Sequence, residues 1–386
     1  MATGKRTKAV VLGAGIGGLT SAIALRRAGF EVAVYERAKE LKPRGAGLGI
    51  QPNAMKALQE IDLDQAVIET GQRLLKMEVF LENGRYVNSL PVDEVGRRFG
   101  APCINLSRPK LQQTLLRELG EDVVMLDSTC EGFTQDEQGV TVRFQDGREV
   151  KGDVLIGADG INSVVRAQLH GSHPPSSGHC VSHVAVPKRR YELPQGLNRY
   201  HWGRGAVFGY HDIGAGSVYW WATTTIPQVG VTSGPAGKAR LRAVFHGWPE
   251  PIPSLIDITA DDEIAPFEEC DRAPLERWGE SRVTLLGDAA HPMISFLAQG
   301  AGMAIEDSVS LRRHLRGCSD HHALVQALRA YERERIPRTA RIVRESRENL
   351  TFMMGTTWLR QLNRNIGGRL LTQQMLRRRL QSIFAG

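Results

Sequence analysis

A glycine-rich turn constrains the fold of this chain more than any other feature. The run Gly13-Ala14-Gly15-Ile16-Gly17-Gly18 follows an apolar strand expected at 8–12 and opens a helix expected at 19–28. A second strand is expected at 31–35, where apolar and polar residues alternate. Strand, glycine turn, helix and strand in this order are typical of the opening of a doubly wound α/β domain.

The spacing of these glycines fits a bound dinucleotide. Gly13 permits the tight turn, Gly15 lets a pyrophosphate approach the backbone, and Gly18 allows close packing of helix and strand. Glu36, at the end of the second strand, can accept hydrogen bonds from both ribose hydroxyls. A glycine turn that binds no nucleotide is the simpler alternative, and these residues alone do not decide between FAD and NAD.

Two later strands end in a similar way. Gly157-Ala158-Asp159-Gly160 ends a buried strand, and Gly287-Asp288-Ala289-Ala290-His291-Pro292 ends another, before Gln299-Gly300-Ala301-Gly302 opens a helix. Ligands of open α/β sheets bind beyond the carboxyl ends of the strands, so one extended cofactor could touch all three ends. Asp288 can accept from a ribityl hydroxyl, and the helix can direct backbone N–H groups at a flavin's pyrimidine edge. A single Asp/Gly pair is better explained as a plain turn, but two such pairs at strand ends beside the glycine turn are not.

The remaining elements indicate a discontinuous first domain. Further helices or strands are expected at 108–119, 123–126, 139–144, 148–150, 154–157, 282–286 and 299–315. Aromatic, threonine and turn residues dominate from about 171 to 266, which favours a mostly antiparallel sheet covering that domain. The tail from His321 is largely helical, and Pro337 predicts a kink or break in it.

Composition narrows the class of protein. At 386 residues the chain suits two closely joined domains. Five scattered cysteines without a CxxC pair argue against a disulfide framework or a metal site and fit a cytoplasmic location. We see no secretory signal and no apolar stretch long enough to span a bilayer.

The net charge of +7 favours anionic ligands in general, but no array of arginines and aromatic residues indicates nucleic acid. The most basic stretch is the C-terminus, where Arg377–Arg379 follow Arg360, Arg364 and Arg369. We interpret it as a helix lying on the body with a solvated basic face. Binding to a membrane surface is the alternative, because a basic amphipathic helix is a permissive pattern.

At these motifs the chain resembles the single-component, class A flavoprotein aromatic hydroxylases, which include salicylate, 3-hydroxybenzoate, 6-hydroxynicotinate and urate hydroxylases. The resemblance covers residues 8–53, 105–116, 153–166 and 280–311, and Tyr331-Glu332…Arg335…Arg338 is similar to the family's YExxRxxR run. It implies a Rossmann-like FAD-binding domain of the GR2 type, an inserted antiparallel substrate sheet and a helical C-terminal tail. The expected boundaries are 1–70, 100–170 and 275–330 for the first, 71–99 and 171–274 for the second, and 331–386 for the third.

The resemblance also implies which residues contact the cofactors. FAD would be bound through the glycine turn, with Arg44 and Gly45-Ala46-Gly47 near a mobile flavin, Arg108 and Gln112 on a helix, and Asp288 at the ribityl chain. Asp159 would serve both FAD and NAD(P)H contacts. The complete expected set is Gly13, Gly15, Ile16, Gly17, Gly18, Glu36, Arg37, Arg44, Gly45, Ala46, Gly47, Arg108, Gln112, Asp159, Asp288, Pro292, Gln299, Gly300, Ala301 and Gly302.

The implied reaction is the hydroxylation of a small aromatic or heteroaromatic substrate by a monomeric or homodimeric enzyme. NADH or NADPH would bind transiently to reduce FAD, and O₂ as co-substrate would form a flavin C4a-hydroperoxide that transfers one oxygen atom. A base that removes a phenolic or N–H proton makes the ring a better nucleophile. The sequence does not identify the substrate or the nicotinamide.

One position departs from the family pattern. The family usually has GDAAHxxxP, but Ser295 stands where the proline is expected, on the substrate side of the flavin, with Phe296 beside it. The shape and polarity of the reaction pocket are therefore expected to differ, and we take Ser295 as a candidate catalytic residue.

The other candidates lie on the expected sheet. Tyr219 resembles a tyrosine that lines the site in urate- and hydroxybenzoate-hydroxylating relatives, and His211 and Arg204 are candidate bases or orienting groups, with His201 behind them. Alternatively, Tyr219 is an ordinary strand residue. Arg204 and His211 are also explained as solvated loop residues.

Other flavoprotein classes fit less well. A flavin halogenase needs a WxWxIP run, whereas Trp221 here is followed by Ala-Thr-Thr-Thr-Ile226-Pro227. A flavin amine oxidase usually lacks the two later Asp/Gly segments in this arrangement. A flavin-dependent epoxidase or oxidase of a natural-product intermediate, and a non-catalytic scaffold of the same fold, remain as alternatives.

Overall fold

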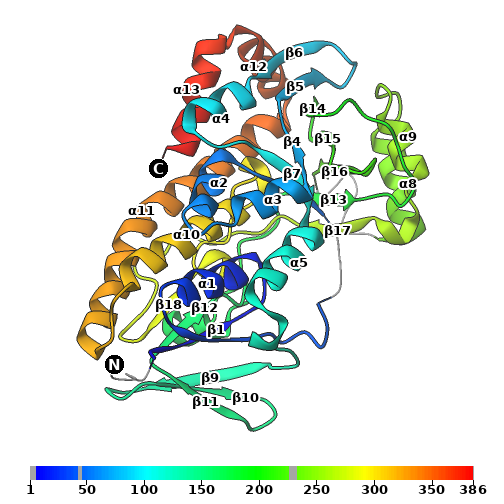
Figure 1. Cartoon of the computed structure of the whole chain (residues 1–386). Helices are drawn as coiled ribbons and strands as arrows, with labels where there is room; N and C mark the ends of the chain where they lie inside the picture. Colours follow the sequence, from blue (N-terminus) through cyan, green and yellow to red (C-terminus); the bar gives the residue numbers. More distant parts are fainter. Residues whose placement is uncertain (1–5, 42–45, 226–232, 386) are drawn as a thin grey trace.

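The computed structural model describes residues 6–41, 46–225 and 233–385 (Figure 1). Arg44, Gly45, Ile226 and Pro227, which the sequence analysis singled out, lie outside these ranges.

A five-stranded parallel sheet forms the base of the first domain. Its strand order is β18-β12-β1-β2-β8, with every neighbouring pair parallel. The strands are β1 (Lys8–Leu12), β2 (Glu31–Tyr35), β8 (Val124–Met125), β12 (Val154–Gly157) and β18 (Val283–Leu285). Apolar side chains on both faces of β1 and β12 are buried, as expected for a parallel sheet covered on both sides. The sheet thus combines strands from both ends of the chain.

Three helices lie close to one another beside this sheet. They are α1 (Ile16–Arg27), α5 (Arg108–Leu119) and α10 (Gly300–Leu315), and α1 contacts both of the others. Further along the chain, β9 (Cys130–Gln135), β10 (Val140–Phe144) and β11 (Glu149–Gly152) form a small antiparallel sheet at one end of the molecule, followed after β12 by α6 (Val164–His170). These elements confirm the predicted hairpin, although α1 begins three residues earlier than expected.

A seven-stranded mixed sheet forms the second layer. Its order is β17-β13-β16-β15-β14-β5-β6, and only β14 and β5 pair in parallel. The strands are β5 (Lys76–Leu81), β6 (Tyr86–Leu90), β13 (Val181–Ala185), β14 (Leu197–Trp202), β15 (Ala206–Asp212), β16 (Val218–Thr224) and β17 (Ala265–Glu268). Helices α8 (Gly234–Val244) and α9 (Ile252–Ile258) cover one face (Figure 1). The sequence analysis did not predict these two helices.

A three-stranded sheet links the two layers. It consists of β3 (Gly47–Ile50), β4 (Gln72–Arg73) and β7 (Ile104–Ser107), with β7 in the middle. Helices α2 (Pro52–Gln59), α3 (Asp64–Thr70) and α4 (Val92–Phe99) lie around it. The mixed α/β class with a discontinuous cofactor domain and an inserted sheet is confirmed, while the division at the expected residue numbers stays a prediction.

The C-terminal part is helical, as expected, with α11 (His321–Met354), α12 (Trp358–Leu370) and α13 (Gln373–Phe384). No break occurs at Pro337, because α11 continues through it, and the kink stays a prediction. Arg335 and Arg338, on either side of the proline, are buried in ion pairs with Glu306 of α10. These contacts hold both halves of the helix against the body, which outweighs the loss of one backbone hydrogen bond.

Candidate functional site

Four strands of the parallel sheet end at the same edge. Leu12 pairs with Tyr35 on one side and with Gly157 on the other, and Gly157 pairs with Leu285. The residues that follow these strands therefore lie side by side along this edge. They are Gly13, Glu36, Asp159 and Asp288.

The glycine turn has the form that a dinucleotide cradle requires. Gly13 has a φ of 101°, and a Cβ there would overlap the carbonyl oxygen of Ala158. A Cβ on Gly18 would overlap the carbonyl oxygen of Gly13, and one on Gly17 would meet Leu286 at 2.7 Å. A Cβ on Gly15, in contrast, would have no neighbour within 4 Å. Three glycines are thus needed for packing, whereas Gly15 leaves open space beside the backbone.

Glu36 closes one side of this turn. Its carboxylate accepts the N–H of Ala14 at 2.8 Å and that of Ala38 at 2.9 Å. Gln112 of α5 donates to the carbonyl of Ala14 at 2.8 Å, so it braces the same turn. Each carboxylate oxygen can accept a further hydrogen bond. Arg37 is exposed next to Glu36.

Asp159 carries an unused acceptor. One oxygen accepts the backbone N–H of Val164 at 2.7 Å and so caps α6, while Oδ1 is buried without a partner among the described residues. Burial raises the pKa of Asp159, although hydrogen bonds from Ser163 and the backbone partly offset this effect. This oxygen can accept a hydrogen bond from a bound group.

Asp288 is accessible, yet desolvation raises its pKa, with His291 and Arg108 acting in the opposite direction. Arg108 acts on this pKa from the start of α5, so its charge lies near the loop after β18.

The loop 287–292, which contains the short helix η3 (Gly287–Ala289), is fixed by hydrogen bonds to buried side chains. His291 lies 2.6 Å from Asp307, which also accepts the N–H of Gly287 and pairs with Arg335 at 2.7 Å. Burial alone would raise the pKa of Asp307, but His291 and Arg335 outweigh it and hold this pKa below its usual value. His291 is thus a positioning residue for this loop. Arg166 adds hydrogen bonds to the carbonyls of Ala289 and Ala290.

The start of α10 lies at the end of the same loop. Gln299 is buried and exchanges hydrogen bonds with Gln51 and Asn53, at 2.6 and 2.9 Å. Gly300, Ala301 and Gly302 form the first turn of the helix, whose backbone N–H groups have no partners within the helix. Pro292 is buried, and its carbonyl accepts the N–H of Arg272 at 3.4 Å.

The strand β3 lies between the edge of the parallel sheet that carries the strand-end residues and the seven-stranded sheet. The N–H of Arg108 donates to the carbonyl of Ala46 at 3.0 Å, and Gly47 follows it in β3. A Cβ on Gly47 would overlap the ring of Tyr219. This contact places Tyr219 beside the expected flavin segment.

An aromatic wall surrounds Tyr219. It consists of Tyr200, His211, Tyr219 and Trp221, which lie on the sheet face opposite α8 and α9. Tyr219 and Trp221 stack with ring centroids 5.6 Å apart, and Tyr200 meets Trp221 edge-on at 4.9 Å. The centroid of His211 is 5.3 Å from that of Tyr219. Trp221 lies directly over Gly209, where a Cβ would overlap the indole.

His211 is the main correction to the sequence analysis. It was also explained as a solvated loop residue, but it is 4% exposed in β15. Neither ring nitrogen has a hydrogen-bond partner among the described residues. Burial lowers the pKa of His211 to about 3, so the ring is neutral near pH 7. Burial also raises the pKa of Tyr219, with Glu269 adding to the effect, so the phenol keeps its proton.

The structure places the other two sheet candidates away from this wall. Arg204 is exposed in the turn between β14 and β15. His201 is buried on the opposite face, where its ring stacks between Phe80 and Tyr210. Burial lowers its pKa to about 4.

A buried carboxylate that the sequence analysis missed lies at the polar end of the wall. Glu269 is 2% exposed and accepts the hydroxyl of Ser182 at 2.6 Å and that of Ser295 at 2.5 Å. The backbone N–H of Ser295, in the short helix η4 (Ser295–Leu297), also donates to Glu269 at 2.9 Å. Thr223 lies 2.8 Å from Ser182. The departure at Ser295 was the only sequence signal for this group.

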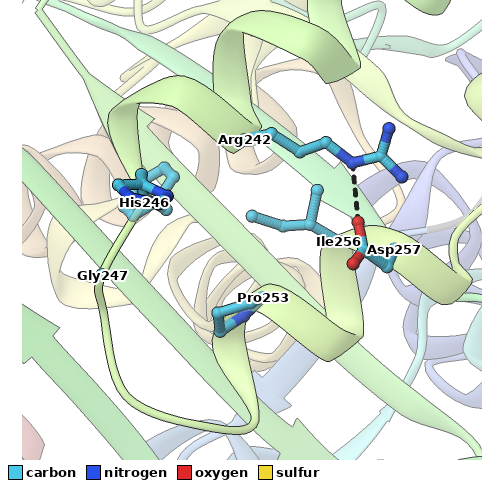
Figure 2. A pocket seen from close by; sticks show the side chains of 7 residues that line it. Arg242, His246, Gly247, Pro253, Ile256 and Asp257 are labelled. Carbon is cyan, nitrogen blue, oxygen red and sulfur yellow. Dashed lines mark hydrogen bonds and ion pairs between the residues drawn. The ribbon is translucent and has the colours of Figure 1, made fainter.

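A hollow elsewhere in the molecule is distinct from this site. It has a volume of about 310 Å³ and lies between α8 and α9, with Arg242 and Asp257 paired at its edge (Figure 2). Because these helices cover the other face of the sheet, the hollow does not adjoin Tyr219 or His211.

Comparisons with known proteins agree with this geometry. The FAD binding domain family matches residues 6–190 and 260–346. Aurachin C monooxygenase/isomerase of Stigmatella aurantiaca is 39% identical over 85% of this chain and 85% of its own length. The 3-hydroxybenzoate 6-hydroxylase of Polaromonas naphthalenivorans (strain CJ2) is 35% identical over 88% of this chain and 86% of its own length.

A longer relative performs a different reaction by name. The chloroplastic zeaxanthin epoxidase of Nicotiana plumbaginifolia is 37% identical over 86% of this chain, which spans only 53% of that protein. Among solved structures, Klebsiella pneumoniae HpxO complexed with FAD and uric acid is 28% identical. It superposes with a TM-score of 0.91 and covers 98% of this chain and 97% of that one.

Proposed function

Because this chain belongs to the class A flavoprotein aromatic hydroxylases, FAD-dependent monooxygenases of the FAD binding domain family, we propose that it uses NADH or NADPH and O₂ to hydroxylate an uncharged aromatic or heteroaromatic substrate. The observation that carries this proposal is the aromatic wall with the unpartnered His211 beside β3. The cytoplasmic location and the monomeric or homodimeric state expected from the sequence remain part of the proposal.

The residues at the strand ends fit FAD. The open space at Gly15 suits a pyrophosphate, the free lone pairs of Glu36 suit ribose hydroxyls, and Asp288 suits the ribityl chain. The free N–H groups at Gly300–Gly302 suit the electron-rich edge of the flavin. When bound, FAD supplies the redox chemistry and oxygen activation that no protein side chain can supply.

His211 would orient the substrate. A neutral imidazole can accept one hydrogen bond and donate another, and burial makes each of them strong. A hydroxyl or ring N–H of the substrate that bonds to His211 would be held at a fixed angle against Tyr219 and Trp221. With a pKa of about 3, His211 is a poor proton acceptor near neutral pH, so its role is orientation more than general base catalysis.

The charge of the wall favours an uncharged substrate. On this sheet face, the described residues of β14, β15 and β16 are all uncharged at neutral pH. They are Asn198, Tyr200, Trp202, Val207, Gly209, His211, Tyr219, Trp221 and Thr223. The one ionisable acid beside them is Glu269, whose negative charge would repel a carboxylate. Aromatic rings also exclude water from the reaction space.

Epoxidation is the second candidate. The 37% identical relative is named an epoxidase, and an uncharged aromatic wall would bind an activated double bond as well as a ring. The two reactions differ in the product and share the same cofactor.

The test begins with an absorbance spectrum of the purified protein, followed by NADH and NADPH consumption under air with neutral phenols, N-heteroaromatics, benzoates and conjugated alkenes. Faster nicotinamide oxidation with an uncharged aromatic, a hydroxylated product and little peroxide would support the proposal. An epoxide product would favour the second candidate. Preference for benzoates would refute the substrate class, and a protein that binds no FAD would refute the function.

A further inference from the structure

Helix α12 is amphipathic in the reverse sense, with its polar side toward the protein. Arg364 is 1% exposed, and its guanidinium donates to the carbonyls of Gly203 and Met353 at 2.9 and 2.5 Å. Asn88 of β6 donates to the carbonyl of Gly368 at 3.0 Å. The helix is therefore attached to the body by hydrogen bonds and not by an apolar face.

The apolar residues of α12 face outward. Leu362, Ile366 and Leu370 follow Trp358 at intervals of four residues, and Leu359 lies beside them, so all five share one side of the helix. Their exposed fractions are 66% for Trp358, 59% for Leu359, 38% for Leu362, 50% for Ile366 and 72% for Leu370. We call these five residues the α12 stripe. The expectation of a solvated basic face is thus wrong for α12, because its most exposed side is apolar.

The charged residues of α12 itself are all arginines, while Glu82, between β5 and β6, accepts a hydrogen bond from Gln361 on the attached side of the helix. Arg360 and Arg369 of α12 are exposed, as are Arg378 and Arg379 of the neighbouring α13, and the sequence has no acidic residue after Glu348. A symmetric pair of chains joined at the stripe would bring these arginines together and would be opposed by their repulsion. An anionic surface, in contrast, complements both the apolar stripe and the arginines.

We propose that the α12 stripe binds the surface of a bilayer that contains anionic lipids. Among the described helices, none is long and apolar enough to cross a membrane. The helix would lie in the plane of the interface, with the stripe among the acyl chains and the arginines at the headgroups. Since α12 lies beside β6, an edge strand of the sheet that carries the aromatic wall, the substrate layer would face the lipid side (Figure 1).

Vesicle sedimentation tests this proposal with the full-length, flavin-loaded protein. The protein should sediment with phosphatidylcholine vesicles that contain about a third phosphatidylglycerol, and less with phosphatidylcholine alone or in high salt. The variant Leu359→Ser/Ile366→Ser should weaken binding at least about tenfold, because two large apolar side chains are lost from the interface. The variant Arg360→Gln/Arg369→Gln should reduce the preference for anionic lipid.

The matched control is Phe267→Ser, which removes a 39% exposed aromatic residue from β17, the opposite edge strand of the same sheet, and should bind like the parent. Unchanged flavin absorbance and unfolding midpoints would show that the variants remain folded. Absence of vesicle binding by the folded parent would overturn the proposal. Equal vesicle binding by Leu359→Ser/Ile366→Ser and by the parent would overturn it too. Dimerisation that is lost in Leu359→Ser/Ile366→Ser would also overturn it and assign the stripe to a second copy.

Discussion

Ser295 donates both its backbone N–H and its hydroxyl to the carboxylate of Glu269, over 2.9 and 2.5 Å. A proline, the usual residue of the family at this position, has neither donor. Because a buried carboxylate needs hydrogen-bond donors, Ser295 and Glu269 form one structural unit. A chain with proline at this position would lack two of the three donors that Glu269 has here.

The variant Ser295→Pro should therefore destabilise the protein by about 1–3 kcal/mol, since it leaves Glu269 with only the hydroxyl of Ser182. In the double variant Ser295→Pro/Glu269→Leu, the loss should be smaller than the sum of the two single losses, because the charge that needed the donors is gone. Urea unfolding of the four proteins measures this coupling. Additive losses would show that the two residues act independently.

The two kinds of glycine in the first turn should behave differently. Gly15→Ala has room for its methyl group, so the stability of the FAD-free protein should stay unchanged while FAD affinity falls at least about tenfold. Gly18→Ala should fold poorly, because its Cβ overlaps the carbonyl oxygen of Gly13. Gly367→Ala, in another open position, is the control for affinity. Flavin titration and thermal unfolding separate the effects; normal FAD binding by Gly15→Ala would contradict the assigned role.

The buried histidines predict an acid-sensitive fold. Burial lowers the pKa of His211 from 6.5 to about 3 and that of His201 to about 4. Below pH 6.5 the unfolded chain gains protons that the folded chain does not, so stability should fall as the pH drops from 6.5 toward these lower values. Each histidine contributes about 1.4 kcal/mol per pH unit in the middle of that range.

Urea unfolding at pH 7, 6 and 5 should show this loss of stability. In His211→Gln, the change of unfolding free energy with pH between pH 6 and 5 should correspond to about one proton fewer than in the parent. Above pH 7 the variant and the parent should have the same slope. An unchanged acid slope in His211→Gln would mean that the imidazole is already protonated in the folded protein.

The contact between Gly47 and Tyr219 should be sensitive to a single methyl group. Gly47→Ala forces its Cβ into the tyrosine ring, which cannot retreat easily because it stacks on Trp221. We expect a loss of about 1–3 kcal/mol of stability and weaker substrate binding. Gly49→Ala, in the same strand, meets only Asn105 at 3.4 Å and should be tolerated. Equal effects of the two changes in unfolding and substrate titration would argue against the contact.

The cofactor edge was predictable from the sequence because its signals are local. Each expected carboxylate follows a strand within three residues, and parallel pairing brings Glu36, Asp159 and Asp288 to one edge. Likewise, the packing of Gly18 depends on Gly13 in the same turn, whereas Gly13 packs against Ala158 at the end of the neighbouring strand.

The substrate side was less predictable because its geometry depends on distant pairing. His211 lies in the wall only because β15 pairs with β16 in the register that sets it opposite Tyr219. Glu269 belongs to a polar run, Glu268-Glu269-Cys270-Asp271, that is typical of an exposed turn, and its donors come from residues 182 and 295. The outward stripe of α12 was missed because counting arginines does not show which side of a helix is attached.

The central sheet also has a consequence for biosynthesis. β1 leaves the ribosome well before β18, which completes the cofactor edge and follows more than two hundred residues later. Until then the apolar strands β1 and β12 lack part of their cover, and such intermediates are prone to aggregate. Loop 287–292 and α10 are the last segments of the expected FAD site to be synthesised, so a nascent chain cannot form the full site before they emerge. The yellow colour of the protein would then report that synthesis has passed residue 315, and flavin supply would influence how much of the newly made chain survives.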